Sequence, residues 1–161
     1  MNRQDAMTET NSMTLREAQR DDMPRIVALL ADDPIGASRE ALADPLPDVY
    51  TRAFEAIEAS PDNTIIVGER DGEVIACLQL TIIPGLGRKG VLRAQIEAVR
   101  VASSERGNGL GERLMRHAVE LASIRGCGLV QLTTDKERGD AHRFYERLGF
   151  VATHEGMKLV L

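Results

Sequence analysis

The segment Arg106-Gly107-Asn108-Gly109-Leu110-Gly111, called the glycine loop below, constrains the fold of this chain more than any other. It joins an apolar strand-like run at 96–101 to a helix-like run at 110–124. Alternating glycines at such a junction let the backbone turn sharply and leave the first amides of the helix without intrahelical partners. Because the helix dipole adds partial positive charge there, the loop predicts a cradle for phosphate or pyrophosphate.

Other glycine-rich sites differ from this one in spacing. A P-loop needs a lysine directly after its last glycine, and none follows Gly111, so a P-loop is excluded. A dinucleotide fingerprint needs Gly-x-Gly-x-x-Gly, whereas this chain has Gly-x-Gly-x-Gly. Asp135 lies about where a ribose-binding acid is expected, but four predicted strands precede the loop, which disfavours that fold. A tight turn that binds nothing stays open on this segment alone.

The length of 161 residues and the ordinary apolar content fit one globular domain over 13–161, behind a disordered tail over 1–12. A net charge of −5 argues against nucleic acid as the main partner, because phosphate backbones demand a basic surface. No apolar run approaches the roughly 20 residues that cross a bilayer, so no membrane partner is expected. The polar segment 1–12 lacks the apolar core of a secretory signal, so a cytoplasmic location is expected. Cys77 and Cys127 lie within or beside apolar strand-like runs, which favours free buried thiols in a reducing compartment, and neither has metal-ligand spacing, so no metal site is expected.

Hydrophobic periodicity predicts an α/β (α+β) fold with one mixed sheet of about seven strands flanked by four helices. Asp71-Gly72 is a strong two-residue hairpin signal, and 84–90 reads as a hairpin connection rather than a second phosphate loop. The helix after the glycine loop implies parallel pairing of the strands on either side of it. Strands are expected at 13–17, 64–69, 73–83, 91–101, 129–134, 150–153 and 157–161.

Two blocks of the sequence resemble the GCN5-related N-acetyltransferase (GNAT) family. Arg106-x-x-Gly109-x-Gly111 matches that family's Arg/Gln-x-x-Gly-x-Gly/Ala signature. The block Phe144-Tyr145-Glu146-Arg147-Leu148-Gly149-Phe150 is similar to its tyrosine-containing C-terminal helix running into the next strand. The blocks lie one helix and one strand apart, and the resemblance covers about residues 13 to 161. It implies the GNAT fold, splayed between the fourth and fifth strands, and an acetyl-CoA-dependent acyltransferase.

The resemblance also implies which backbone would hold acetyl-CoA. Pantetheine would insert like an extra strand beside the fourth strand, and the Val99 amide would stabilise the oxyanion of a tetrahedral intermediate. The charge of Arg106 would add to the pyrophosphate site, although a plain surface arginine stays open. The cofactor-binding residues implied are Val99, Arg100, Val101, Arg106, Gly107, Asn108, Gly109, Leu110 and Gly111.

Two side chains are candidates for proton transfer. By resemblance, Tyr145 would protonate the departing thiolate, although its place on the apolar stripe of its helix also suits a core residue. Glu97 is placed where many family members carry a glutamate that deprotonates the amine, directly or through water. Glu97 equally suits a solvated strand edge. Family members often have Asn at the position of Arg138, which leaves open whether Arg138 reaches a phosphate of CoA or is a solvated loop arginine.

The resemblance implies transfer of acetyl to a primary amine of a small molecule by direct attack in a ternary complex. The acceptor would lie between 35–50 and 84–90, and Asp33, Asp44 and Asp48 would attract a cationic amine unless they are merely solvated charges. Two alternatives stay open: a non-catalytic CoA-binding or regulatory module, and a protein (lysine or N-terminal) acetyltransferase. The resemblance also leaves room for a homodimer.

Overall fold

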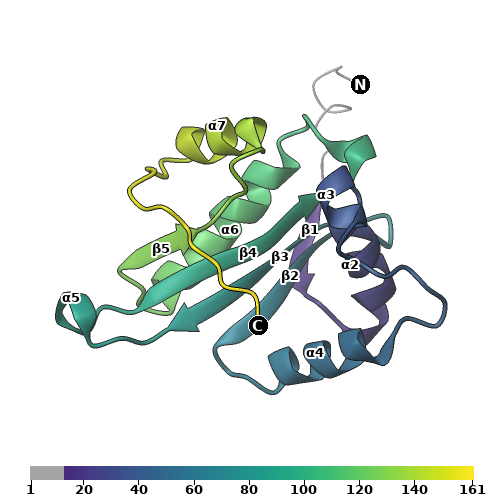
Figure 1. Cartoon of the computed structure of the whole chain (residues 1–161), viewed down its shortest axis with the longest axis horizontal. Helices are drawn as coiled ribbons and strands as arrows, with labels where there is room; N and C mark the ends of the chain where they lie inside the picture. Colours follow the sequence, from purple (N-terminus) through teal and green to yellow (C-terminus); the bar gives the residue numbers. More distant parts are fainter. Residues whose placement is uncertain (1–12) are drawn as a thin grey trace, which may run out of the picture.

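A computed structural model describes residues 13–161, which form a five-stranded mixed sheet with helices on both faces (Figure 1). The tail predicted over 1–12 lies outside the described residues. The first four strands pair antiparallel with their neighbours, and the last pairs in parallel with the fourth, as predicted. In spatial order, which is also chain order, they are β1 (Thr14–Glu17), β2 (Asn63–Arg70), β3 (Glu73–Ile83), β4 (Arg93–Val101) and β5 (Leu129–Leu132).

Six helices occur in the described part of the chain, so the predicted count of four is corrected. Four are the expected ones, and two are single turns, too short to give a periodic apolar pattern. The Asp33 side chain accepts a hydrogen bond from the Gly36 amide at 2.7 Å and so caps one of the short turns. The helices are α2 (Met23–Leu30), α3 (Pro34–Ala37), α4 (Asp48–Glu58), α5 (Gly87–Gly90), α6 (Leu110–Ile124) and α7 (Gly139–Arg147).

The core lies on both faces of the sheet because side chains alternate along its central strands. Leu78 and Leu80 of β3 pack in the cluster under α6, whereas Cys77 packs in the cluster under α2. α4 lies beside α2 over β2, on that second face (Figure 1). α6 buries one face at helical spacing, through Leu110, Leu114, Met115, Ala118 and Ala122.

A β-bulge interrupts β4 at the place where the sheet opens. Two residues of β4, Ala98 and Val99, oppose the single residue Leu78 of β3. Ala98 has a φ of 54°, in the left-handed region that residues with a Cβ seldom adopt. Pairing with β5 stops at Ile96 and Leu132, just before the bulge. The rest of β4 therefore has an open edge, which is the predicted splay between the fourth and fifth strands.

The strands predicted at 150–153 and 157–161 are absent, so the expected count of seven strands is wrong. After α7 the chain runs as a coil with every residue from 151 onward exposed (Figure 1). Strand propensity measures how well a side chain suits a half-buried pleated surface, and it forms no strand without a neighbouring edge to supply hydrogen bonds. That edge is a tertiary feature, which apolar alternation in the sequence does not reveal.

Candidate active site

The glycine loop (106–111) leaves open space beside its backbone. Gly107 and Gly109 have φ values of 83° and 75°, and a Cβ added at either position would meet nothing within 4 Å. Gly109 is the N-cap of α6, so the free amides of the first helical turn face the same region. An open cradle at the positive end of a 15-residue helix suits a phosphate group. The structure therefore fits the predicted pyrophosphate of CoA at this loop.

Side chains from a distant loop hold the glycine loop in place. Asp32, which follows α2, accepts a hydrogen bond from the Ser103 amide at 2.7 Å. The Arg106 guanidinium donates through Nη2 to the Asp32 carbonyl at 2.9 Å and through Nε to the Val101 carbonyl at 3.1 Å. Arg106 is thus turned back toward β4, where it lies beside the open edge.

The open edge of β4 presents backbone groups to one side. The Ala102 amide donates to the Ile75 carbonyl of β3 at 2.9 Å, so alternation directs the backbone of Val101 away from β3. The Val99 carbonyl, on the same outer side, accepts a hydrogen bond from the Arg100 side chain at 2.9 Å. The structure thereby brings the predicted pantetheine-binding strand beside the glycine loop.

Tyr145 lies in the second half of α7 and packs edge-to-face on Phe144 and Phe150, with ring centroids 5.2 and 6.0 Å away. Burial raises the pKa of its phenol, and the nearby charges of Arg100 and Arg138 partly offset that rise. The phenol therefore holds its proton at neutral pH. Its hydroxyl makes no hydrogen bond within residues 13–161. Because Arg100 belongs to β4, these interactions place Tyr145 near the open edge.

Glu97 lies on the other face of the sheet, directly before the bulge. Ile96 is buried under α6, so alternation points Glu97 toward the face that carries α2 and α4. The residue is exposed, and its carboxylate forms no ion pair with any side chain of the described range. Tyr145 packs on the α6 side, so the two candidate proton-transfer groups flank β4 from opposite faces.

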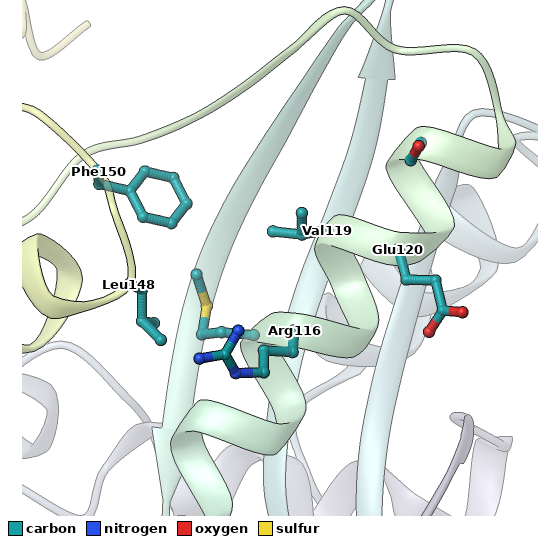
Figure 2. A pocket seen from close by; sticks show the side chains of 7 residues that line it. Arg116, Val119, Glu120, Leu148 and Phe150 are labelled. Atoms are coloured by element: carbon teal, nitrogen blue, oxygen red, sulfur yellow. The ribbon is translucent and has the colours of Figure 1, made fainter.

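A cavity of about 140 Å³, called the bulge cavity below, lies between α2, α4 and the bulge of β4. Burial raises the pKa of the Cys77 thiol in its wall to about 12, so that sulfur is neutral. A larger hollow of about 320 Å³ lies between α6 and the end of α7 (Figure 2). Leu148 and Phe150 line it across from Val119, and no predicted site residue borders it. The bulge cavity is the one adjoining the candidate chemistry.

An ion-pair cluster that the sequence did not reveal joins three parts of the site. Asp33 accepts from both terminal nitrogens of Arg138, at 2.9 and 3.0 Å, and Arg100 lies 3.8 Å away. Burial alone raises the pKa of Asp33, but the Gly36 amide and Arg138 guanidinium outweigh it and hold the pKa below its usual range. In this structure Asp33 pairs with arginines instead of facing an amine, and Arg138 is half-buried and ion-paired rather than a solvated loop arginine.

Similarity to known proteins agrees with this geometry. The class that the fold and site define is the acetyl-CoA-dependent N-acetyltransferases. Residues 12–150 match the acetyltransferase (GNAT) family, and the chain belongs to that family. No helix in residues 13–161 has the length and apolar character to cross a membrane, and no three His, Cys, Asp or Glu side chains of that range gather as a metal site.

Individual relatives differ in what their names describe. Aminoalkylphosphonate N-acetyltransferase from Salmonella typhimurium is 29% identical over 141 residues, covering 87% of this chain and 86% of the relative. Streptothricin acetyltransferase from Streptomyces lavendulae is 41% identical over 58 residues, covering 36% and 31%. A crystal structure of a transcriptional regulator from Bacillus halodurans C-125 is 47% identical with a TM-score of 0.91, covering 93% and 100%. A putative acetyltransferase from Agrobacterium tumefaciens is 32% identical with a TM-score of 0.78, covering 92% and 99%.

Proposed function

We propose that the protein transfers an acetyl group from acetyl-CoA to a primary amine of a small molecule, by direct attack in a ternary complex. The observation that carries this proposal is the position of β4. Its open edge lies beside the glycine loop, while its bulge borders a cavity on the face of α2 and α4. Both substrates can therefore reach the same few residues at once, as direct attack requires. Two relatives carry names of small-molecule acetyltransferases, which supports a small acceptor.

In this proposal each side chain does a limited task. Glu97 removes a proton from the ammonium, directly or through water, on the face of the bulge cavity. Tyr145 supplies a proton to the departing thiolate from the opposite side of β4. The backbone of Val99 and Val101 pairs with pantetheine along the open edge, and Arg100 lies between them in the same binding segment. Pyrophosphate is held by the glycine loop, which comprises Arg106, Gly107, Asn108, Gly109, Leu110 and Gly111.

The test is thiol-release kinetics with acetyl-CoA against a panel of small amines and lysine peptides. The proposal expects turnover with at least one small amine and initial-rate patterns of a ternary complex. Turnover with peptides alone would indicate a protein acetyltransferase instead. If acetyl-CoA raises the melting temperature but no amine is acetylated, a non-catalytic CoA-binding module is the better description.

We also infer a cytoplasmic homodimer. Cys77 and Cys127 are free thiols, as is usual in a reducing compartment. The described range exposes ten large apolar side chains, and half of them lie in the terminal coil: Val151, Met157, Leu159, Val160 and Leu161. Within residues 13–161 the outer edge of β5 has no partner strand, so exchange of terminal segments between two copies would cover that edge and the apolar side chains. Light scattering should give a dimer that deletion of 157–161 converts to monomer; a monomeric full-length chain at 100 μM or so would contradict this.

A further inference from the structure

The bulge cavity carries no charged side chain. Its walls come from one face each of α2 and α4 and from the strands below them. The buried apolar part of its lining comprises Ile26, Val27, Phe54 and Leu78. The side chains with polar groups among its lining residues are Tyr50, Gln79 and Cys77. The cavity is therefore an apolar space next to a strand where acetyl transfer is proposed.

The polar groups of the wall already have partners. The Tyr50 hydroxyl donates to Glu40 at 2.8 Å and accepts from the Ala41 amide at 2.9 Å, so it serves the loop before α4. The Gln79 amide donates to Asn63 at 3.4 Å. The Cys77 thiol is neutral and lies 3.8 Å from the Ala98 carbonyl. A charged group placed inside this cavity would find no counter-charge and would be strongly disfavoured.

We propose that the acceptor is a monoamine whose non-reacting part is one apolar group, an aromatic ring or a branched alkyl chain, seated in the bulge cavity. This inference rests on the proposed acetyl transfer and names its substrate class. The volume supports it, because an apolar cavity of about 150 Å³ accommodates benzene and this one measures about 140 Å³. The amine itself lies at the mouth beside Ala98, where the neighbouring Glu97 carboxylate attracts an ammonium.

This acceptor differs in chemistry from a phosphonate or a polyamine. The carboxylate of Glu97 at the mouth would repel an anionic phosphonate. The second ammonium of a polyamine would lie inside the cavity, where no side chain of the wall carries a compensating charge. Three arginines lie near the open edge, and each is already paired with a carboxylate: Arg100 and Arg138 with Asp33, and Arg106 with Asp32. The cavity thus selects amines by the burial of apolar surface.

A homologous series of n-alkylamines tests the inference directly. Each added methylene should raise kcat/KM about fourfold until the cavity is full. The kcat/KM values for benzylamine and for 3-methylbutylamine should each exceed those for aminomethylphosphonate and putrescine by at least about tenfold. A flat series, or a preference for either charged compound, overturns the inference.

A pair of variants on α4 locates the effect. Ala53 is an exposed residue that lines the cavity, whereas Ala56, one turn away and also exposed, does not line it. Ala53→Phe should raise KM for benzylamine at least about tenfold and leave KM for acetyl-CoA unchanged, because the new ring fills the cavity. Ala56→Phe should change neither. Equal behaviour of the two variants toward benzylamine would place the acceptor elsewhere.

Calorimetry with benzylamine in the presence of CoA separates this inference from the proposed function. If benzylamine binds, Ala53→Phe weakens that binding and no amine is acetylated, the result contradicts acetyl transfer but supports the apolar site. If small amines are acetylated but benzylamine does not bind, the result supports acetyl transfer and contradicts the apolar site.

Discussion

The Nε of Arg106 donates a hydrogen bond to the carbonyl of Val101 across the open edge of β4, at 3.1 Å. Arg100 makes the same kind of contact with the carbonyl of Val99, two residues earlier. These are the two outward carbonyls of the strand beside which pantetheine is proposed to insert. Guanidinium groups thus contact the same carbonyls that the amides of the proposed pantetheine would use. Cofactor binding should therefore release Arg106 toward the pyrophosphate.

Arg106→Gln tests that role. Loss of a charge-assisted contact to pyrophosphate should raise KM for acetyl-CoA about five- to tenfold at low ionic strength, with kcat nearly unchanged. Steady-state kinetics measure both constants. Arg116→Gln is the matched control, because Arg116 lies on α6, the helix that follows the glycine loop, and among residues 13–161 it pairs with the exposed Glu112 of the same helix. A KM equal to wild type in Arg106→Gln would show that the guanidinium stays on β4.

Tyr145→Phe should lower kcat about 100-fold and leave KM for acetyl-CoA within about twofold. The ring contacts with Phe144 and Phe150 are kept, so the melting temperature should change little. Because burial raises the pKa of the phenol, deprotonation of Tyr145 should not lower the wild-type kcat until the pH exceeds about 10, the ordinary pKa of a tyrosine. A pH–rate profile measures this. Wild-type rates in the variant would return Tyr145 to a purely packing role.

Asp33→Asn tests the ion-pair cluster. The substitution leaves two half-buried guanidiniums, Arg100 and Arg138, without their carboxylate, and should lower the free energy of unfolding by about 1–3 kcal/mol at pH 7. The folded pKa of Asp33 is depressed, so its contribution is present above the unfolded pKa of about 3.9 and lost as the pH falls through the folded value. Urea denaturation at pH 7 and pH 3 should therefore show a difference between wild type and variant that shrinks in acid. A constant difference would contradict the cluster's role.

Ala98→Gly should raise the free energy of unfolding, by up to about 1 kcal/mol, because glycine adopts the left-handed bulge conformation without strain. Ala94→Gly is the control: Ala94 is buried in regular β4 pairing, where glycine should destabilise. Thermal or urea unfolding distinguishes the two signs. Destabilisation by both substitutions would mean that Ala98 is not held in that conformation.

The sequence predicted those features of the fold that depend only on residues close together in the chain. Asp71 and Gly72 form the predicted hairpin turn, with φ values of 52° and 78°. Gly109 caps α6 where the glycine spacing placed the start of that helix. Such features depend on backbone sterics within a few residues, which residue type alone reveals.

Contacts between distant segments were decided only by the tertiary structure. Asp33 and Arg138 are 105 positions apart, and nothing in their surroundings marks them as partners. The segment at 157–161 has the composition of a strand, but it pairs with none of the sheet edges and runs as a coil. The apolar character of the bulge cavity likewise arises where α2 and α4 meet over β4. Pairing, edges and cavities depend on which surfaces the fold brings together. The sequence by itself therefore predicted the family and its acetyl-CoA cosubstrate, whereas only the tertiary structure revealed the cavity proposed for the acceptor.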